Sequence, residues 1–136
     1  IDFSGNFYEG TSAVHSHMTN SRLTDPETLE FRYPVILEEF SIRTGSGGAG
    51  KYYGGDGVIR KISFLEPMII SVLSGHRTIG PPGLLGGGSG QVGLTSLLRN
   101  NGSVKKLKYA DQIEGKKGDT LVVETPGGGA LGALTE

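Results

Sequence analysis

The chain has 136 residues and no cysteine, and its 13 basic and 14 acidic residues leave a formal net charge of -1. This length predicts one domain, and the even charge balance argues against a partner such as nucleic acid or an anionic membrane surface. The lack of cysteine excludes disulfides and thiolate metal sites, and no signal peptide or membrane-spanning apolar run is present, so we expect a cytoplasmic protein.

Glycine is the main compositional anomaly. There are 24 glycines, well above the usual share of about 7%. Such a chain is expected to fold with long turns or to rest on a partner. The first 12 residues show no periodicity and are interpreted as a connector or as the cut end of a longer chain.

A short helix is predicted for residues 25–31. Thr24 or Asp25 can cap it, and Pro26 suits the first helical position, where a missing N–H costs nothing. The helix must end before Pro34, because proline disfavours helical geometry in the residue that precedes it.

The rest of the chain predicts a mainly β fold of short antiparallel strands joined by glycine-rich loops. In the first strand, Glu38 and Glu39 mark a bulge if the apolar residues are to share a face. Residues 68–73 form a continuous apolar run that predicts a buried strand. The predicted strands are residues 35–42, 58–64, 68–73, 94–99, 104–109 and 120–124.

Two tight turns are predicted between these strands. Asn101-Gly102 is a strong hairpin signal, because both residues tolerate positive φ, and it should pair residues 94–99 with 104–109. Lys117-Gly118-Asp119 should form a second turn before the last strand.

The loop at residues 45–57 begins with two phosphate-binding patterns: residues 45–50 fit the dinucleotide fingerprint, and residues 45–51 fit most of a P-loop. We expect neither to be real, since Tyr52 follows Lys51 where a P-loop needs a serine or threonine, and the next glycines forbid a helix. The alternatives left are a glycine nest that binds an anion through backbone N–H groups and a purely structural loop. Asp56 is expected to stabilise its own turn.

A weak metal site is an option near the start of the chain. His15 and His17 are two residues apart, which on a strand places both imidazoles on one face, and Asp25 or Glu27 could supply a carboxylate. The alternative is a polar strand face without a metal.

His17, Asn20 and Arg22 form the main candidate catalytic cluster. A site that opens an amide needs a proton carrier near neutral pH, a group that orients the substrate, and a fixed cation where negative charge develops. The alternative is that Asn20 and Arg22 only satisfy backbone groups at a turn. His76 and Arg77 are a second candidate pair, with an exposed turn as the competing interpretation.

Five lysines form the one basic cluster. A solvated edge strand and turn, protected from aggregation by lysine, explains it best. The five are Lys105, Lys106, Lys108, Lys116 and Lys117.

Several motifs occur together in a recognisable order. The motifs HMTN, TDPE and RYPVIL lie between His17 and Leu37, and they are followed by GSGGAG, GGDG, FLEP and finally ETPGGG. This order resembles the C-terminal part of the hydantoinase B/5-oxoprolinase family, and the motif sequences resemble those of its eukaryotic-type members. Members have many hundreds of residues, so residues 1–136 are interpreted as a C-terminal segment of a longer chain or as a detached domain.

The resemblance implies part of an ATP-dependent amidohydrolase that opens 5-oxo-L-proline to L-glutamate. ATP and a divalent metal would be bound outside this segment, and no cofactor is expected within it. The implied partners are the rest of the enzyme chain or a partner subunit and a cyclic amide, with a homo-oligomer as an option. The resemblance also argues against the metal site, since relatives commonly lack a histidine at the position of His15.

Two alternative functions stay open. The chain could be a non-catalytic β interaction module or a truncated remnant of the family, silent by itself. It could also belong to a related hydantoinase, lactamase or ketone carboxylase.

Overall fold

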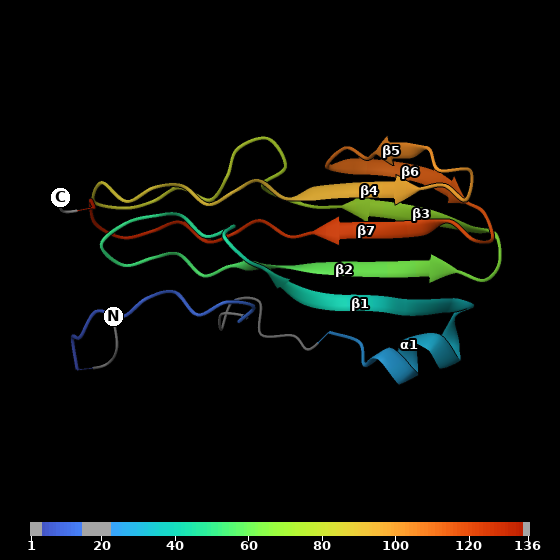
Figure 1. Cartoon of the computed structure of the whole chain (residues 1–136), viewed down its shortest axis with the longest axis horizontal. Coiled ribbons are helices and arrows are strands. Elements are labelled where there is room, and N and C mark those ends of the chain that lie inside the picture. The colour runs from blue at the N-terminus through green and yellow to red at the C-terminus, as the bar shows by residue number, and fades with distance from the viewer. Residues whose placement is uncertain (1–3, 15–22, 135–136) are drawn as a thin grey trace.

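The computed structural model describes residues 4–14 and 23–134. The expectation of a mainly β fold is confirmed: the described part contains seven strands and one short helix (Figure 1). No helix in this part of the chain is long and apolar enough to cross a membrane. The elements are α1 (Pro26–Arg32), β1 (Val35–Arg43), β2 (Gly57–Phe64), β3 (Met68–Leu73), β4 (Leu94–Leu98), β5 (Val104–Lys106), β6 (Ala110–Gly115) and β7 (Thr120–Glu124).

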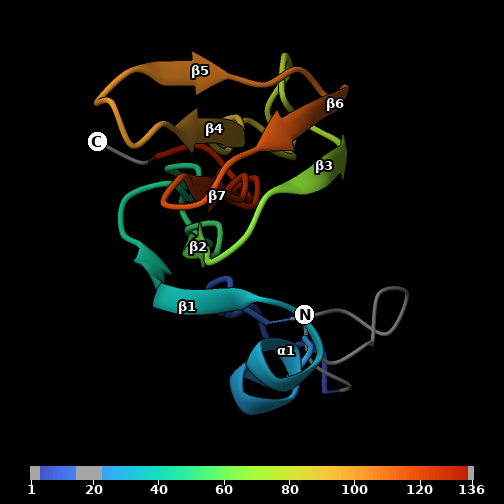
Figure 2. The ribbon, with the colours of Figure 1, turned by 90° about the vertical axis from the view of Figure 1, so that its right-hand side faces the viewer.

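The strands form two antiparallel sheets. The larger sheet has the order β1-β2-β7-β4-β5, and β3 pairs with β6 in a separate two-stranded sheet. Figure 2 shows β3 and β6 lying across the larger sheet, with α1 beyond β1 at the sheet edge. Apolar side chains from both sheets make the core, which consists of Val35, Phe64, Ile70, Leu97, Leu107 and Ile113.

The predicted helix is confirmed within one residue at each end. The Asp25 side chain accepts a hydrogen bond of 3.0 Å from Glu27 N, and Pro26 occupies the first turn. The helix has no buried residue, and Leu29 packs against the edge of the core. Its stability therefore depends on the cap and on contact with β1.

The first strand contains the predicted bulge. The register between β1 and β2 shifts between Leu37 and Glu39. The shift adds one residue to β1, which changes the face that the following residues present. Lys61 on β2 lies 2.6 Å from the Glu39 carboxylate beside this bulge.

The hairpin prediction is confirmed, although its second strand is shorter than expected. β4 and β5 are antiparallel neighbours, and Gly102 has a φ of +84° in the turn between them. The second predicted turn also holds, with Gly118 at a φ of +82°. Strand β6 was missed, because Ile113 is its one strongly β-forming residue and the pattern is too weak to predict a strand.

A strand forms at residues 68–73 as predicted, but the prediction that it is buried was wrong. Ile70 is its one buried residue, while Ile69 and Leu73 are 70% and 89% exposed. The cause is that β3 belongs to a two-stranded sheet with one face on the core and the other outward. An apolar run does not distinguish these two situations.

Beyond the sheet, the glycine-rich segments 44–56, 74–93 and 125–134 lie side by side (Figure 1). The first two segments turn back on themselves, since Gly54 N bonds to Gly48 O and Gly90 N bonds to Pro81 O. Gly88 N donates to Ala49 O and Gln91 N to Ser46 O, each at 2.8 Å. Successive bonds are thus three residues apart on both segments, from 88 to 91 and from 49 to 46. That period is typical of polyproline II geometry rather than of a β ladder. We name these three segments the glycine bundle.

Close backbone contact explains the glycine excess. A Cβ atom on Gly127 would lie 1.8 Å from Ser46 O, and one on Gly54 would lie 2.1 Å from Gly128 O. Gly47 faces Gly54 O in the same way, at 2.1 Å. The glycines therefore form the packed interior of the bundle, as glycine does at the crowded axis of a collagen triple helix. The expectation of long turns missed this packing.

Candidate functional site

The catalytic cluster predicted from sequence, His17, Asn20 and Arg22, lies outside the described residues, as does His15. Their assignment stays a prediction. Asp25, the carboxylate in the weak metal option, is described, and it caps α1 through Glu27 N. Its carboxylate thus has a structural role.

The chain just before this cluster is bound to the glycine bundle. Gly10 N donates to Tyr53 O at 2.7 Å, and Ala13 N donates to Asp56 O at 3.0 Å. The Ser12 hydroxyl accepts a bond of 2.9 Å from Asp56 N. The last residues before the histidine motif are therefore fixed against the GGDG loop.

Asp56 links the two arms of its loop. Its Oδ1 accepts a bond of 2.8 Å from Gly47 N, and the Ser46 hydroxyl lies 3.5 Å away. The bond from Gly47 N lowers the pKa of Asp56, although partial burial opposes this shift. The expectation that Asp56 stabilises its own turn was wrong, since its side chain bonds to residues nine and ten positions earlier.

Ser46 completes this polar junction. It is buried, and its hydroxyl accepts a bond of 2.9 Å from Gly57 N at the start of β2. The sequence analysis did not select Ser46 or Ser12. A serine between two glycines in a loop gives no signal that its hydroxyl will pair with a distant backbone amide.

The glycine loop lacks the geometry of a phosphate-binding loop. Strand β2 follows it, as expected from the glycines that forbid a helix. Its amides are also occupied, because Gly47 N bonds to Asp56, Gly48 N to Gly128 O, and Lys51 N to Gly132 O. These contacts favour the structural loop over the glycine nest at those three positions.

Two arginines meet where the sheet continues into the bundle. Arg43 donates to Val92 O at 2.8 Å and to Thr125 O at 3.1 Å, while its Nε lies 3.5 Å from the Glu124 carboxylate. Arg77 donates to Glu124 O at 2.7 Å. Burial and the nearby charge of Arg43 lower the pKa of Arg77, whereas Glu124 opposes the shift. The pair cross-links backbone carbonyls at this junction.

The second candidate pair is divided by the structure. Arg77 points into the junction, where Ser74 Oγ accepts a further bond of 2.8 Å from its Nε. His76 is exposed, has a φ of +50°, and places Nδ1 3.2 Å from Ile79 O. The exposed-turn interpretation thus holds for His76, and Arg77 has a structural role.

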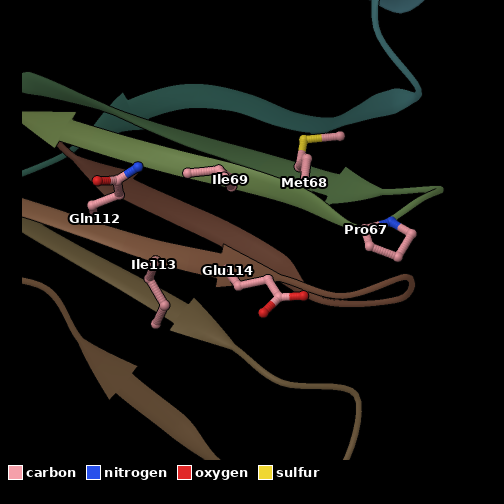
Figure 3. Close-up of a pocket in the computed structure, with 6 residues that line it drawn as sticks. All are labelled: Pro67, Met68, Ile69, Gln112, Ile113 and Glu114. Carbon is pink, nitrogen blue, oxygen red and sulfur yellow. The ribbon is translucent and has the colours of Figure 1, made fainter.

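A surface hollow of about 480 Å³ lies on the two-stranded sheet (Figure 3). Met68 and Ile69 of β3 and Glu114 of β6 are among its lining residues. Among the described residues that line it, Glu114 is the one titratable side chain, and these residues provide no acid–base pair. Within residues 4–14 and 23–134, no three His, Asp or Glu side chains are grouped closely enough to hold a metal ion.

Comparison with known proteins agrees with the sequence motifs. The family model for hydantoinase B/oxoprolinase matches residues 4–134. The chain is 47% identical over 125 residues to the 5-oxoprolinase of Dictyostelium discoideum, covering 92% of this chain and 10% of that protein. It therefore spans about a tenth of the length of this relative.

Two solved structures share the fold. The ATP-dependent caprolactamase of Pseudomonas jessenii has a TM-score of 0.66 and 25% sequence identity, over 80% of this chain and 20% of that chain. An acetone carboxylase in its nucleotide-free form has a TM-score of 0.72 and 20% identity, over 92% of this chain and 21% of that chain. Because the family model matches nearly the whole length of this chain, the chain belongs to the hydantoinase B/oxoprolinase family.

Proposed function

We propose that this chain is the C-terminal part of an ATP-dependent amidohydrolase that opens 5-oxo-L-proline to L-glutamate. The observation that carries the proposal is the 47% identity to a 5-oxoprolinase over 125 residues. The nucleotide and a divalent metal would be bound by other parts of the enzyme, or by a partner subunit. The glycine loop at residues 45–57 supports this division, because the backbone amides of Gly47, Gly48 and Lys51 already bond within the protein.

The chemistry of the proposed site rests on His17, Asn20 and Arg22. His17 would carry a proton near neutral pH, Asn20 would orient the ring amide through hydrogen bonds, and Arg22 would stabilise developing negative charge. The described residues on both sides of this motif are held by hydrogen bonds, which supports the proposal. Ala13 N bonds to Asp56 O before the motif, and Asp25 caps α1 after it.

A test would compare turnover in the complete enzyme that contains this segment. His17→Ala and Arg22→Ala should each lower ATP-dependent glutamate release from 5-oxoproline by roughly 100-fold or more, because the first removes the proton carrier and the second a charge-stabilising donor. His15→Ala is the matched control and should change turnover far less. Thermal unfolding of each variant separates loss of chemistry from loss of folding. Wild-type turnover in folded His17→Ala and Arg22→Ala proteins would make this segment a scaffold.

A second candidate is a related activity on another cyclic amide or on a ketone. The fold similarity to a caprolactamase and to an acetone carboxylase supports it. The same complete enzyme should be assayed with 5-oxoproline, caprolactam, hydantoin and acetone plus bicarbonate. A turnover preference for any of the last three would replace 5-oxoproline as the proposed substrate. Absence of turnover with all four would favour a non-catalytic β module.

A further inference from the structure

Two turns meet at the end of the larger sheet that lies away from the glycine bundle (Figure 1). One joins β4 to β5, and the other joins β6 to β7. Between them is a pocket of about 610 Å³, whose lining includes the cations Arg99, Lys116 and Lys117. Asn100, Asn101 and Asp119 also line it.

Asp119 is the one acid among the described residues that line this pocket, and its charge is already paired. Asp119 is 2% exposed, and its Oδ2 lies 2.7 Å from Arg99 Nη1 and accepts a bond of 2.8 Å from Lys116 N. Its Oδ1 accepts a bond of 3.0 Å from Asn100 N. The carboxylate thus joins the two turns, and its charge is balanced by Arg99.

The remaining cations are uncompensated. Lys116 and Lys117 are exposed, and neither takes part in an ion pair in the described part of the chain. Arg99 uses Nη1 for Asp119 and for Glu114 O at 2.9 Å. Its Nε and Nη2 groups bond to no described residue, so the guanidinium keeps donors available. The described lining residues therefore carry an excess of two positive charges. Asp119 holds the backbone of both turns in place through its bonds to Asn100 N and Lys116 N.

We propose that this pocket binds a small anion with phosphate groups. Lysine binds phosphate as a point charge and arginine donates to its oxygens, and a multiply charged phosphate gains more from these cations than a carboxylate does. The volume of about 610 Å³ has room for a ligand with more than one phosphate. The site is independent of the proposed amidohydrolase chemistry.

The test is a calorimetric titration of the purified protein with inorganic pyrophosphate at a fixed ionic strength of about 0.1 M. We expect saturable binding with one site per chain. The double variant Lys116→Gln/Lys117→Gln should bind about tenfold or more weakly. Lys105→Gln/Lys106→Gln removes the same charge from β5, outside the pocket lining, and should change the affinity less than about twofold, since exposed charges are screened.

Amide chemical shifts of the unmodified protein give a second readout that needs no variant. Pyrophosphate should move the signals of residues 99–103 and 116–119 more than those of Lys105 and Lys106. No saturable binding, equal weakening in both double variants, or shifts spread over all lysines would overturn the site. Succinate binding as tightly as pyrophosphate would overturn the preference for phosphate.

Discussion

Single glycines in the bundle carry out a packing role that no other residue can fill. A Cβ on Gly127 would lie 1.8 Å from Ser46 O and 2.2 Å from Ser46 C, both backbone atoms. A backbone contact cannot be relieved by a side-chain rotation, so the two segments must separate. The separation would also strain the bond from Gly127 N to Gln91 O at 3.1 Å.

Gly127→Ala should therefore lower the free energy of unfolding by about 3 kcal/mol or more, at the upper end of overpacking costs. Gly75→Ala is the matched control, because its Cβ would meet nothing within 4 Å and Gly75 does not have a positive φ. Denaturant unfolding measures both variants. Equal stability of the two would show that the bundle does not depend on close glycine packing.

Asp119 makes stability depend on pH. Burial by itself would raise its pKa, but hydrogen bonds from Lys116 N, Arg99 and Asn100 N outweigh burial and place the pKa below its usual range. A lowered pKa contributes stability that is fully present above the unfolded value of about 3.9 and is lost as the pH falls through the folded value. Unfolding should thus become easier below about pH 4.

Asp119→Asn should remove about 3 kcal/mol at pH 7, because Arg99 loses its buried partner. The stability difference between this variant and the unmodified protein should shrink as the pH is lowered from 6 to 3. Glu66→Gln, a change at an exposed side chain, provides the control and should leave stability within about 0.5 kcal/mol. A difference that stays constant with pH would contradict the assigned pKa direction.

At the level of elements, the sequence predicted what local chemistry determines. Pro26 and Pro34 bracket the helix, and Asn101-Gly102 specifies the hairpin, because each effect acts within a few residues. Strand β6 and the outward face of β3 were missed for the opposite reason. Pairing with a distant strand decides whether β6 forms, and the layer on either side decides whether β3 is buried.

The candidate site shows the same limit. The motif around His17 was found from the order of short sequence motifs. The role of Ser12 depends on Asp56, 44 residues away, and that of Ser46 depends on the buried backbone amide of Gly57. Asp56 was expected to act locally and instead bonds across its loop. Hydrogen bonds that close loops leave no periodic pattern, so sequence reasoning had no basis for pairing these groups.

At the scale of the whole molecule, exposed large hydrophobic residues outnumber buried hydrophobic residues in the described part, by twenty to seven. Seven hydrophobic residues are buried in the described part, while the exposed large ones there include Leu73 at 89% and Ile69 at 70%. Extended exposed apolar patches commonly mark interaction surfaces. Since the chain spans 10% of a related 5-oxoprolinase, we expect the outward face of β3 to be covered by further chain or by a partner subunit.

Leu73→Ser tests this expectation. In the longer protein of which this chain is proposed to be the C-terminal part, the variant should lose about 2 kcal/mol of unfolding free energy, because burial of a leucine side chain contributes about that much. In residues 1–136 alone, the same change should stay within about 0.5 kcal/mol, because Leu73 is exposed there. Leu97→Ala is the reference, since Leu97 is 0% exposed and its truncation should cost about 2 to 5 kcal/mol in both proteins. If Leu73→Ser is neutral in both while Leu97→Ala destabilises both, the outward face of β3 is solvent-exposed in the longer protein as well, and its apolar residues do not bind a neighbour.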